Sequence, residues 1–258
     1  MPDSKRASEM FSLEGRLAVV TGGGTGLGFA MASCLSAAGA HVVITGRRAQ
    51  VLEEAAKSLG PNVSPEQYDV TDLAGAPAFM ARVEERYGNP EILINNAGIH
   101  VKKSIEEHTL EDFHSVLATH VEGAFAITRA AIPAMKRSGR GSIIFIASMS
   151  SLLGLPGVVA YSAAKSAYLG MVRSLAAELG ACNIRVNAIA PGWIETSMLH
   201  KALDGDPKRQ QKILDRTPQQ RFGSPEDIGW AAVYLCSPAA AFINGVVLPV
   251  DGGASIGF

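Results

Sequence analysis

Tyr161 and Lys165 stand four positions apart in the small-residue stretch AYSAAKSAY, residues 160–168. On a helix, side chains at this spacing leave the same face roughly 5–6 Å apart. A lysine at that distance favours the ionised form of a tyrosine, whose ordinary pKa of about 10 is too high for proton exchange near neutral pH. The pair is therefore a candidate proton donor with its activating cation, or two unrelated side chains on an ordinary helix.

A glycine-rich segment, VVTGGGTGLG at residues 19–28, joins an apolar run to a helical pattern. Its glycines allow a tight turn and close approach of the backbone to a pyrophosphate, and the following helix offers free N–H groups at its N-terminus. A purely structural turn is the alternative. We predict a dinucleotide site with contacts from Gly22, Gly24, Thr25, Gly26, Leu27 and Gly28.

The end of the second expected strand, VITGRRAQ at residues 43–50, indicates which dinucleotide is used. An acidic residue there would bond the ribose hydroxyls of NAD, whereas an arginine can hold the extra phosphate of NADP through paired hydrogen bonds. This segment has no acid but carries Arg47 and Arg48, which are two solvated side chains on the alternative interpretation. The pattern favours NADP(H) and leaves NAD(H) possible.

Apolar runs alternate with helical patterns along the whole chain. Strands are expected at residues 16–21, 41–45, 91–95, 142–147, 184–190 and 246–250, and a less certain one at 62–70, where Pro65 suits a short or marginal strand. Such strands, separated by helices, predict an α/β fold with a parallel sheet covered on both faces. We assign residues 1–12 to a flexible tail and residues 13–258 to one domain.

Residues 193–222 have no strand pattern and are polar and charged. Ligands of open α/β sheets bind outside the carboxyl ends of the strands. Because this insertion follows the sixth expected strand, we expect a mobile substrate lid.

The composition argues against a macromolecular partner. The 258 residues are 47% hydrophobic and carry a net charge of -1, so there is no bulk attraction to nucleic acid or to an anionic membrane. The three cysteines, Cys34, Cys182 and Cys236, are far apart and do not have metal-binding spacing. No run approaches the ~18 apolar residues of a membrane helix. We expect a cytoplasmic protein that binds a small molecule and no metal.

Five motifs occur in one order: Thr21-Gly-x-x-x-Gly26-x-Gly28, NNAG at 95–98, Ser148, Tyr161-x-x-x-Lys165, and PG at 191–192. On these residues the chain resembles the short-chain dehydrogenase/reductase family, from about residue 13 to VDGG at 250–253. The resemblance implies a single-domain Rossmann-type, doubly wound parallel sheet of about seven strands. It also implies a homotetramer or homodimer.

The same resemblance implies roles for the site residues. Tyr161 would exchange a proton with the substrate oxygen, Ser148 would donate a hydrogen bond to that oxygen, and Lys165 would lower the pKa of Tyr161 and bond the nicotinamide ribose. Other cofactor contacts would come from Asp69, Val70, Asn95, Ala97, Gly98, Pro191, Gly192, Ile194 and Thr196, besides Tyr161 and Lys165 themselves.

His120 departs from the family pattern, because the family usually has an asparagine there that binds a water in a proton relay to the lysine. The histidine could bind that water through its backbone carbonyl, titrate near neutral pH itself, or simply pack in the core. We keep His120 as a fourth candidate catalytic residue.

The substrate is the least constrained expectation. The segment after NNAG, with Lys102 and Lys103, together with ASMSS and RTPQQRFG, is similar to gluconate 5-dehydrogenases and related sugar-acid reductases. Basic residues there and in the lid, Lys201, Arg209 and Arg216, would attract an anion unless they are ordinary solvated side chains. A 3-oxoacyl thioester reductase shares every catalytic motif. Enoyl reductases space the tyrosine and lysine more widely, and a non-catalytic NADP-binding sensor should have lost a catalytic residue.

Overall fold

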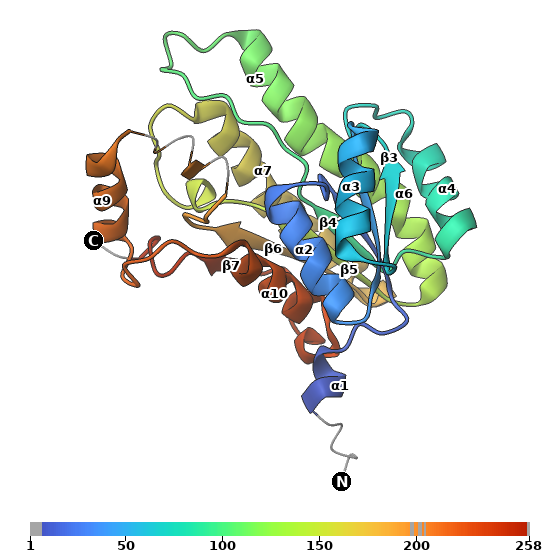
Figure 1. The fold of residues 1–258 in the computed structure, drawn as a ribbon. Coiled ribbons are helices and arrows are strands. Elements are labelled where there is room, and N and C mark those ends of the chain that lie inside the picture. The colour runs from blue at the N-terminus through green and yellow to red at the C-terminus, as the bar shows by residue number, and fades with distance from the viewer. Residues whose placement is uncertain (1–6, 197–198, 201–202, 204, 257–258) are drawn as a thin grey trace.

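One seven-stranded parallel sheet organises the protein in the computed structural model, which describes residues 7–196, 199–200, 203 and 205–256 (Figure 1). Its order is β3-β2-β1-β4-β5-β6-β7, which confirms the doubly wound α/β fold. The strands are β1 (Leu17–Thr21), β2 (His41–Gly46), β3 (Val63–Gln67), β4 (Ile92–Asn95), β5 (Gly141–Ile146), β6 (Ile184–Pro191) and β7 (Val247–Val250).

The strand order reverses beside β1. The chain moves outward from β1 through β2 to β3, then returns to pair β4 with the other side of β1. Pro65 lies on β3, the edge strand, as its missing N–H requires. Connections therefore diverge at the carboxyl ends of β1 and β4, where open α/β sheets form a ligand crevice.

Helices cover both faces of the sheet because alternate strand residues are apolar on both sides. From β1, Ala18 and Val20 join a buried cluster with α2, α3 and α10, while Leu17 and Val19 join a second cluster with α4, α6 and α7. The main helices are α2 (Gly26–Ala37), α3 (Ala49–Leu59), α4 (Ala76–Tyr87), α5 (Leu110–Leu117), α6 (Gly123–Ser138), α7 (Val159–Leu179) and α10 (Pro225–Cys236). Short helical turns are η1 (Ala118–Glu122), η2 (Met149–Ser151), η3 (Gly180–Cys182) and η4 (Pro238–Ala240).

The two segments expected outside the compact body contain helices. Within residues 1–12, α1 (Ala7–Phe11) places Phe11 with its ring centroid 6.2 Å from that of Tyr234. Within residues 193–222, α9 (Pro207–Arg216) starts at the cap Asp206, whose side chain accepts a hydrogen bond from the Arg209 N–H. Residues 1–6, 197–198, 201–202 and 204 of these segments, including Lys201, lie outside the described residues.

Candidate active site

The glycine-rich turn packs tightly against the first turn of α2. Gly22 and Gly26 have positive φ values of 66° and 55°, and a Cβ on Gly28 would meet the Gly22 carbonyl oxygen at 2.1 Å. The positive φ values favour glycine, and the close contact at Gly28 leaves no room for a side chain. Thr25, the N-cap, makes no side-chain cap hydrogen bond, so the first-turn N–H groups of α2 have no cap to satisfy them. This geometry fits the pyrophosphate of a dinucleotide.

The NNAG segment holds that turn through Asn96, a residue that sequence reasoning missed. Its amide donates to the carbonyl oxygens of Thr21 at 2.9 Å and Gly22 at 3.3 Å. The Thr21 hydroxyl in turn accepts from the backbone N–H groups of Asn96 and Ala97. The Asn96 side chain therefore connects the end of β4 to the end of β1, where the strand order reverses.

Asn95 points elsewhere. Its side chain is buried and donates to the Thr128 hydroxyl of α6 at 3.0 Å, and its Oδ1 has no partner among the described residues. Any cofactor contact by Asn95 would therefore need its free amide oxygen or its backbone. Its role at the cofactor stays a prediction.

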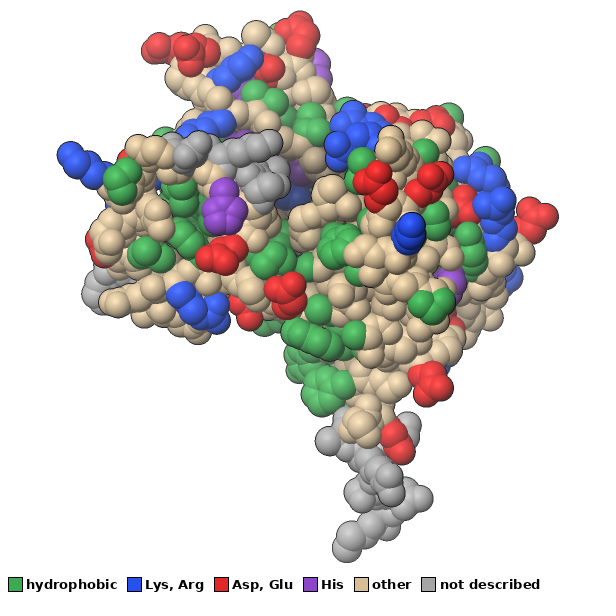
Figure 2. Space-filling view, in the orientation of Figure 1, with side chains coloured by type: hydrophobic (Ala, Val, Ile, Leu, Met, Phe, Trp, Pro, Cys, Tyr) green, Lys and Arg blue, Asp and Glu red, His purple; other side chains and the backbone are tan. Residues whose placement is uncertain are grey.

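Arg47 and Arg48 lie between β2 and α3, and both are exposed. Neither forms an ion pair with a described residue. Figure 2 shows basic side chains gathered over the amino-terminal end of α3, where these two residues lie. Two unpaired guanidinium groups beside the glycine-rich turn are available to a phosphate.

The remaining predicted cofactor contacts follow two other strands. Asp69, whose carboxylate accepts from the Thr71 N–H and hydroxyl, and the buried Val70 follow β3. Beyond β6, a Cβ on Gly192 would meet the Cα of Asp251 at 2.6 Å, and Ile194 forms a bridge to Gly223. The structure thus places Pro191 at the carboxyl end of β6 and the other contacts in the segments that follow the strands' carboxyl ends: Asp69, Val70, Ala97, Gly98, Gly192, Ile194 and Thr196.

Tyr161 and Lys165 share one face of α7, as their spacing predicts. The Lys165 Nζ is 5.5 Å from the centroid of the Tyr161 ring and donates to the Ile146 carbonyl oxygen at 2.6 Å. Ser148 follows β5, where its hydroxyl accepts from the Ser150 N–H at 3.1 Å and also bonds the Tyr161 hydroxyl. The side chains of Ser148 and Lys165 thus both lie beside Tyr161, beyond the end of β5.

Burial sets the proton affinities of this pair. It lowers the pKa of Lys165 to about 7, since the ammonium is desolvated. It raises the pKa of Tyr161, an effect that the hydrogen bond to Ser148 only partly offsets. The net pKa of Tyr161 is therefore raised and not lowered as expected, because desolvation disfavours tyrosinate and ammonium alike.

His120 is buried behind Tyr161 in the π-helical turn η1. Its Nε2 lies 3.1 Å from the Ile99 nitrogen and 2.8 Å from the Ile99 carbonyl oxygen, and its ring meets the Tyr161 ring edge-on at 5.5 Å. Burial, with Lys165 nearby, lowers the pKa of His120 to about 3, which argues against titration near neutral pH. The His120 carbonyl already accepts from the Tyr168 hydroxyl at 2.7 Å.

A second histidine, His100, was missed. Its ring centroid lies 4.9 Å from that of Tyr161, on the outer side of the loop that follows NNAG. Its only sequence signal is its place two residues after that motif, and the ring contact comes from a helix about 60 residues further along the chain.

Comparisons with known proteins agree with this geometry. A family model described as Enoyl-(Acyl carrier protein) reductase matches residues 22–255. Gluconate 5-dehydrogenase of Gluconobacter oxydans is 36% identical, over 96% of this chain and 98% of its own. The 3-oxoacyl-(acyl-carrier-protein) reductase of Thermotoga maritima is 34% identical, over 95% and 99%.

Among solved structures, a gluconate 5-dehydrogenase from Burkholderia cenocepacia in complex with NADP and tartrate superposes with a TM-score of 0.94. It is 33% identical, and the match covers 98% of this chain and 100% of the other. With the ordered motifs, the reversed sheet and the converging Ser148, Tyr161 and Lys165, this protein belongs to the short-chain dehydrogenase/reductase family and is an oxidoreductase acting on alcohol and ketone groups.

Proposed function

We propose that this protein is an NADP(H)-dependent oxidoreductase that interconverts a secondary alcohol and a ketone on a sugar acid or polyol. One observation carries the proposal: Ser148 and Lys165 flank the partly buried Tyr161 beyond the end of β5, at the same carboxyl end of the sheet as the glycine-rich turn. This is the geometry of a proton donor beside a dinucleotide site.

Each residue has a defined task in the reduction. A bound nicotinamide supplies the hydride to the carbonyl carbon. Ser148 donates a hydrogen bond to the carbonyl oxygen, and Tyr161 gives that oxygen its proton. The raised pKa of Tyr161 keeps the proton on the hydroxyl at neutral pH, which suits a donor in this direction. Lys165, as ammonium, stabilises the tyrosinate that results.

The preference for NADP rests on Arg47 and Arg48. Both are exposed and unpaired among the described residues, and no acid stands at the end of β2 to bond the ribose hydroxyls of NAD. The Burkholderia relative, crystallised with NADP, supports the same choice.

The substrate class rests on charge and on the relatives. Lys103 pairs with Asp112 at 2.6 Å, which leaves Lys102 as the exposed cation without an ion pair on this loop of the described chain. A sugar-acid carboxylate is a suitable partner for such a cation. Two relatives carry the name gluconate 5-dehydrogenase.

A 3-oxoacyl thioester reductase is the second candidate, favoured by the similarity to the Thermotoga enzyme. The four-residue spacing of Tyr161 and Lys165 disfavours an enoyl reductase. A sensor without turnover is disfavoured because Ser148, Tyr161 and Lys165 are all present.

A homotetramer or homodimer in the cytoplasm completes the proposal. Large apolar side chains at the surface support self-association: Phe242 is fully exposed, and Trp230 and Phe11 are about half exposed. Hydrophobic side chains gather near the point where the chain leaves α1 (Figure 2). No described helix is long and apolar enough to cross a membrane.

The test is an activity panel with NADPH and NADH against 5-ketogluconate, other keto-sugars, an acetoacetyl thioester and simple ketones. We expect the fastest reduction with NADPH and a keto-sugar acid. Tyr161→Phe should lower turnover on the order of 10³-fold with little change in NADPH affinity, while Tyr234→Phe on α10 serves as the control. Comparable turnover in Tyr161→Phe would refute the catalytic assignment.

A further inference from the structure

The His100 ring lies against the Tyr161 ring. The two ring centroids are 4.9 Å apart with 54° between the ring planes, and His100 itself is exposed. Because the two rings are in contact, a substrate that brings its carbonyl oxygen to the Tyr161 hydroxyl comes within reach of this imidazole.

His120 holds the two residues that precede His100 in the chain, Gly98 and Ile99. The His120 Nε2 contacts both the N–H and the carbonyl of Ile99, and a Cβ on Gly98 would meet the His120 ring at 2.1 Å. Gly98 and Ile99 are therefore held against a buried ring, and the next residue along the chain projects over Tyr161. Within the described part of the chain, the His100 ring makes this aromatic contact but no hydrogen bond.

We propose that His100 determines substrate specificity by hydrogen-bonding a hydroxyl group on the carbon next to the reacting carbonyl. The inference rests on the proposed function, since it requires Tyr161 to be the proton donor. It names the substrate feature that the site recognises, a hydroxyl on the carbon beside the carbonyl, as in α-hydroxy ketones and the vicinal diols they yield.

The charge state of His100 favours a hydroxyl over a carboxylate. Although the residue as a whole is exposed, partial desolvation of its ring, followed by the charge of Lys102, lowers the pKa of His100, so the neutral imidazole is favoured at pH 7. A neutral imidazole offers one donor and one acceptor, which match the donor and acceptor of a hydroxyl group. A carboxylate elsewhere on the same substrate is better served by the ammonium of Lys102.

Hydroxyacetone and 2-butanone test the proposal, because they differ only by a hydroxyl in place of a methyl. Wild type should prefer hydroxyacetone in kcat/KM. His100→Phe keeps a ring against Tyr161 but removes the hydrogen bond, and should lower kcat/KM for hydroxyacetone about 10-fold or more while that for 2-butanone changes less than about 2-fold. His100→Gln should restore part of the preference. His114→Phe, on the exposed face of α5, is the control.

The inference is overturned by a wild type that reduces hydroxyacetone no better than 2-butanone, or by a His100→Phe variant that loses both activities equally. Thermal melting of each variant separates a folding defect from a loss of recognition. The proposed function fails separately, if wild type reduces no carbonyl compound in the panel with either cofactor. Reduction of only a thioester substrate would leave the enzyme class standing and remove the role of His100.

Discussion

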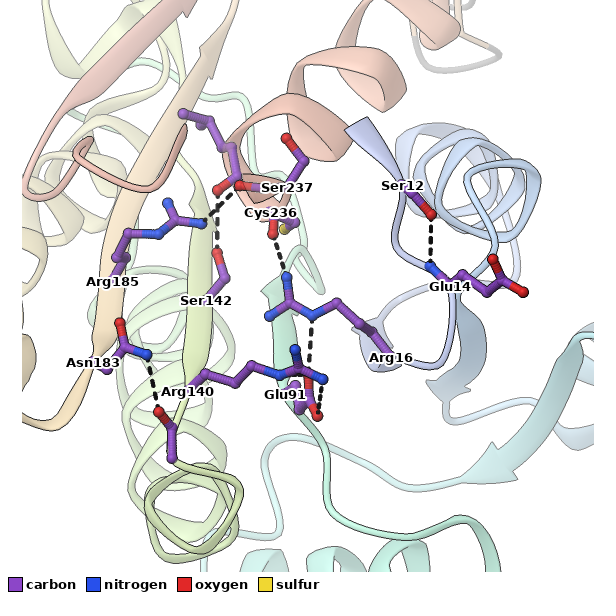
Figure 3. A network of polar contacts seen from close by, with 12 residues as sticks. Ser12, Glu14, Arg16, Glu91, Arg140, Ser142, Asn183, Arg185, Cys236 and Ser237 are labelled. Atoms are coloured by element: carbon purple, nitrogen blue, oxygen red, sulfur yellow. Dashed lines mark hydrogen bonds and ion pairs between the residues drawn. The ribbon is translucent and has the colours of Figure 1, made fainter. Parts of the chain in front are cut away.

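At the amino-terminal end of the sheet, Glu91 lies between Arg16 and Arg140 (Figure 3), whereas at the carboxyl end Arg47 and Arg48 have no ion pair with a described residue. The Glu91 carboxylate is 3.0 Å from Arg16 and 2.7 Å from Arg140. All three precede strands: Arg16 before β1, Glu91 before β4 and Arg140 before β5.

Further contacts at the amino end tie α10 to the sheet. The Arg16 guanidinium donates to the Cys236 carbonyl oxygen at 2.6 Å, and Arg185 donates to the Ser237 carbonyl oxygen at 3.5 Å, as Figure 3 shows. The last turn of α10 leaves its carbonyl groups without intrahelical partners, so these arginines satisfy it. These contacts stabilise the packing of α10 against the sheet.

The carboxyl end of the sheet instead contains buried polar groups without partners in the described part of the chain, which lower the stability of the fold. Lys165 is buried without a carboxylate partner among the described residues, and Asn95 Oδ1 and His120 Nδ1 are buried without a hydrogen-bond partner there. Such groups destabilise a fold unless a ligand uses them. The amino-terminal end of the sheet thus satisfies its buried charges with partners, whereas the reactive end keeps buried polar groups that lack one among the described residues.

The largest effect is expected from Lys165→Met, which should lower turnover on the order of 10³-fold yet raise the free energy of unfolding by about 1–3 kcal/mol at pH 7. The pKa of this lysine falls from 10.5 to about 7 on folding, so its penalty is full below pH 7 and fades as pH rises toward 10.5. Urea unfolding at pH 7 and pH 10 measures this. A variant less stable than wild type at pH 7 would contradict the assigned cost.

Glu91→Ala should lower the free energy of unfolding, the opposite of Lys165→Met, because it leaves the nearly buried Arg16 without its carboxylate. We expect the free energy of unfolding to fall by about 2–4 kcal/mol, with unchanged turnover per folded molecule. Glu84→Ala breaks the more exposed pair with Arg137 and should cost less than about 1 kcal/mol. Equal losses in the two variants would remove the distinction between the ends.

Arg47→Asp tests whether the unpaired Arg47 binds the extra phosphate of NADPH. The KM for NADPH should rise about 10–100-fold through the loss of charge-assisted hydrogen bonds to phosphate, with little change for NADH. Lys57→Asp, in the last turn of α3, makes the same change of charge at the helix's other end and is the control. An unchanged KM for NADPH would refute NADP recognition by Arg47.

The smallest effect is expected from His120→Asn. Because the pKa of His120 is about 3, the imidazole is neutral throughout the range from about pH 5 to pH 9 and adds no limb to the pH profile. Turnover should change less than about 3-fold, and the profile of kcat against pH should keep its shape. A shifted limb would mean that His120 titrates during the reaction.

The expected fold and the convergence of the reactive side chains were accessible from the sequence for a physical reason. Period and spacing are local: apolar runs of five or six residues form buried strands, and four positions on α7 bring Tyr161 and Lys165 to one face at 5.5 Å. Pro65 in the same way indicated an edge strand, which β3 is. These expectations depend on few distant contacts.

The direction of a side chain and the pKa of a buried group could not be predicted in this way, because both depend on residues far away in the sequence. Asn95 and Asn96 are equivalent in sequence, yet only packing turns one toward Thr128 and the other toward the glycine-rich turn. Lys165, with the charge of a bound nicotinamide, is expected to lower the pKa of Tyr161, whereas burial in the protein alone raises it, since desolvation depends on everything packed around α7.

The sequence by itself determined the alternation of strands and helices, the glycine-rich turn, and the pairing of Tyr161 with Lys165, because each follows from backbone geometry over a few residues. Only the tertiary structure decided that His120 is a neutral buried support, that His100 overlies Tyr161, and that Glu91 joins Arg16 to Arg140. Those outcomes join residues far apart in the chain, and burial and long-range contact set their chemistry.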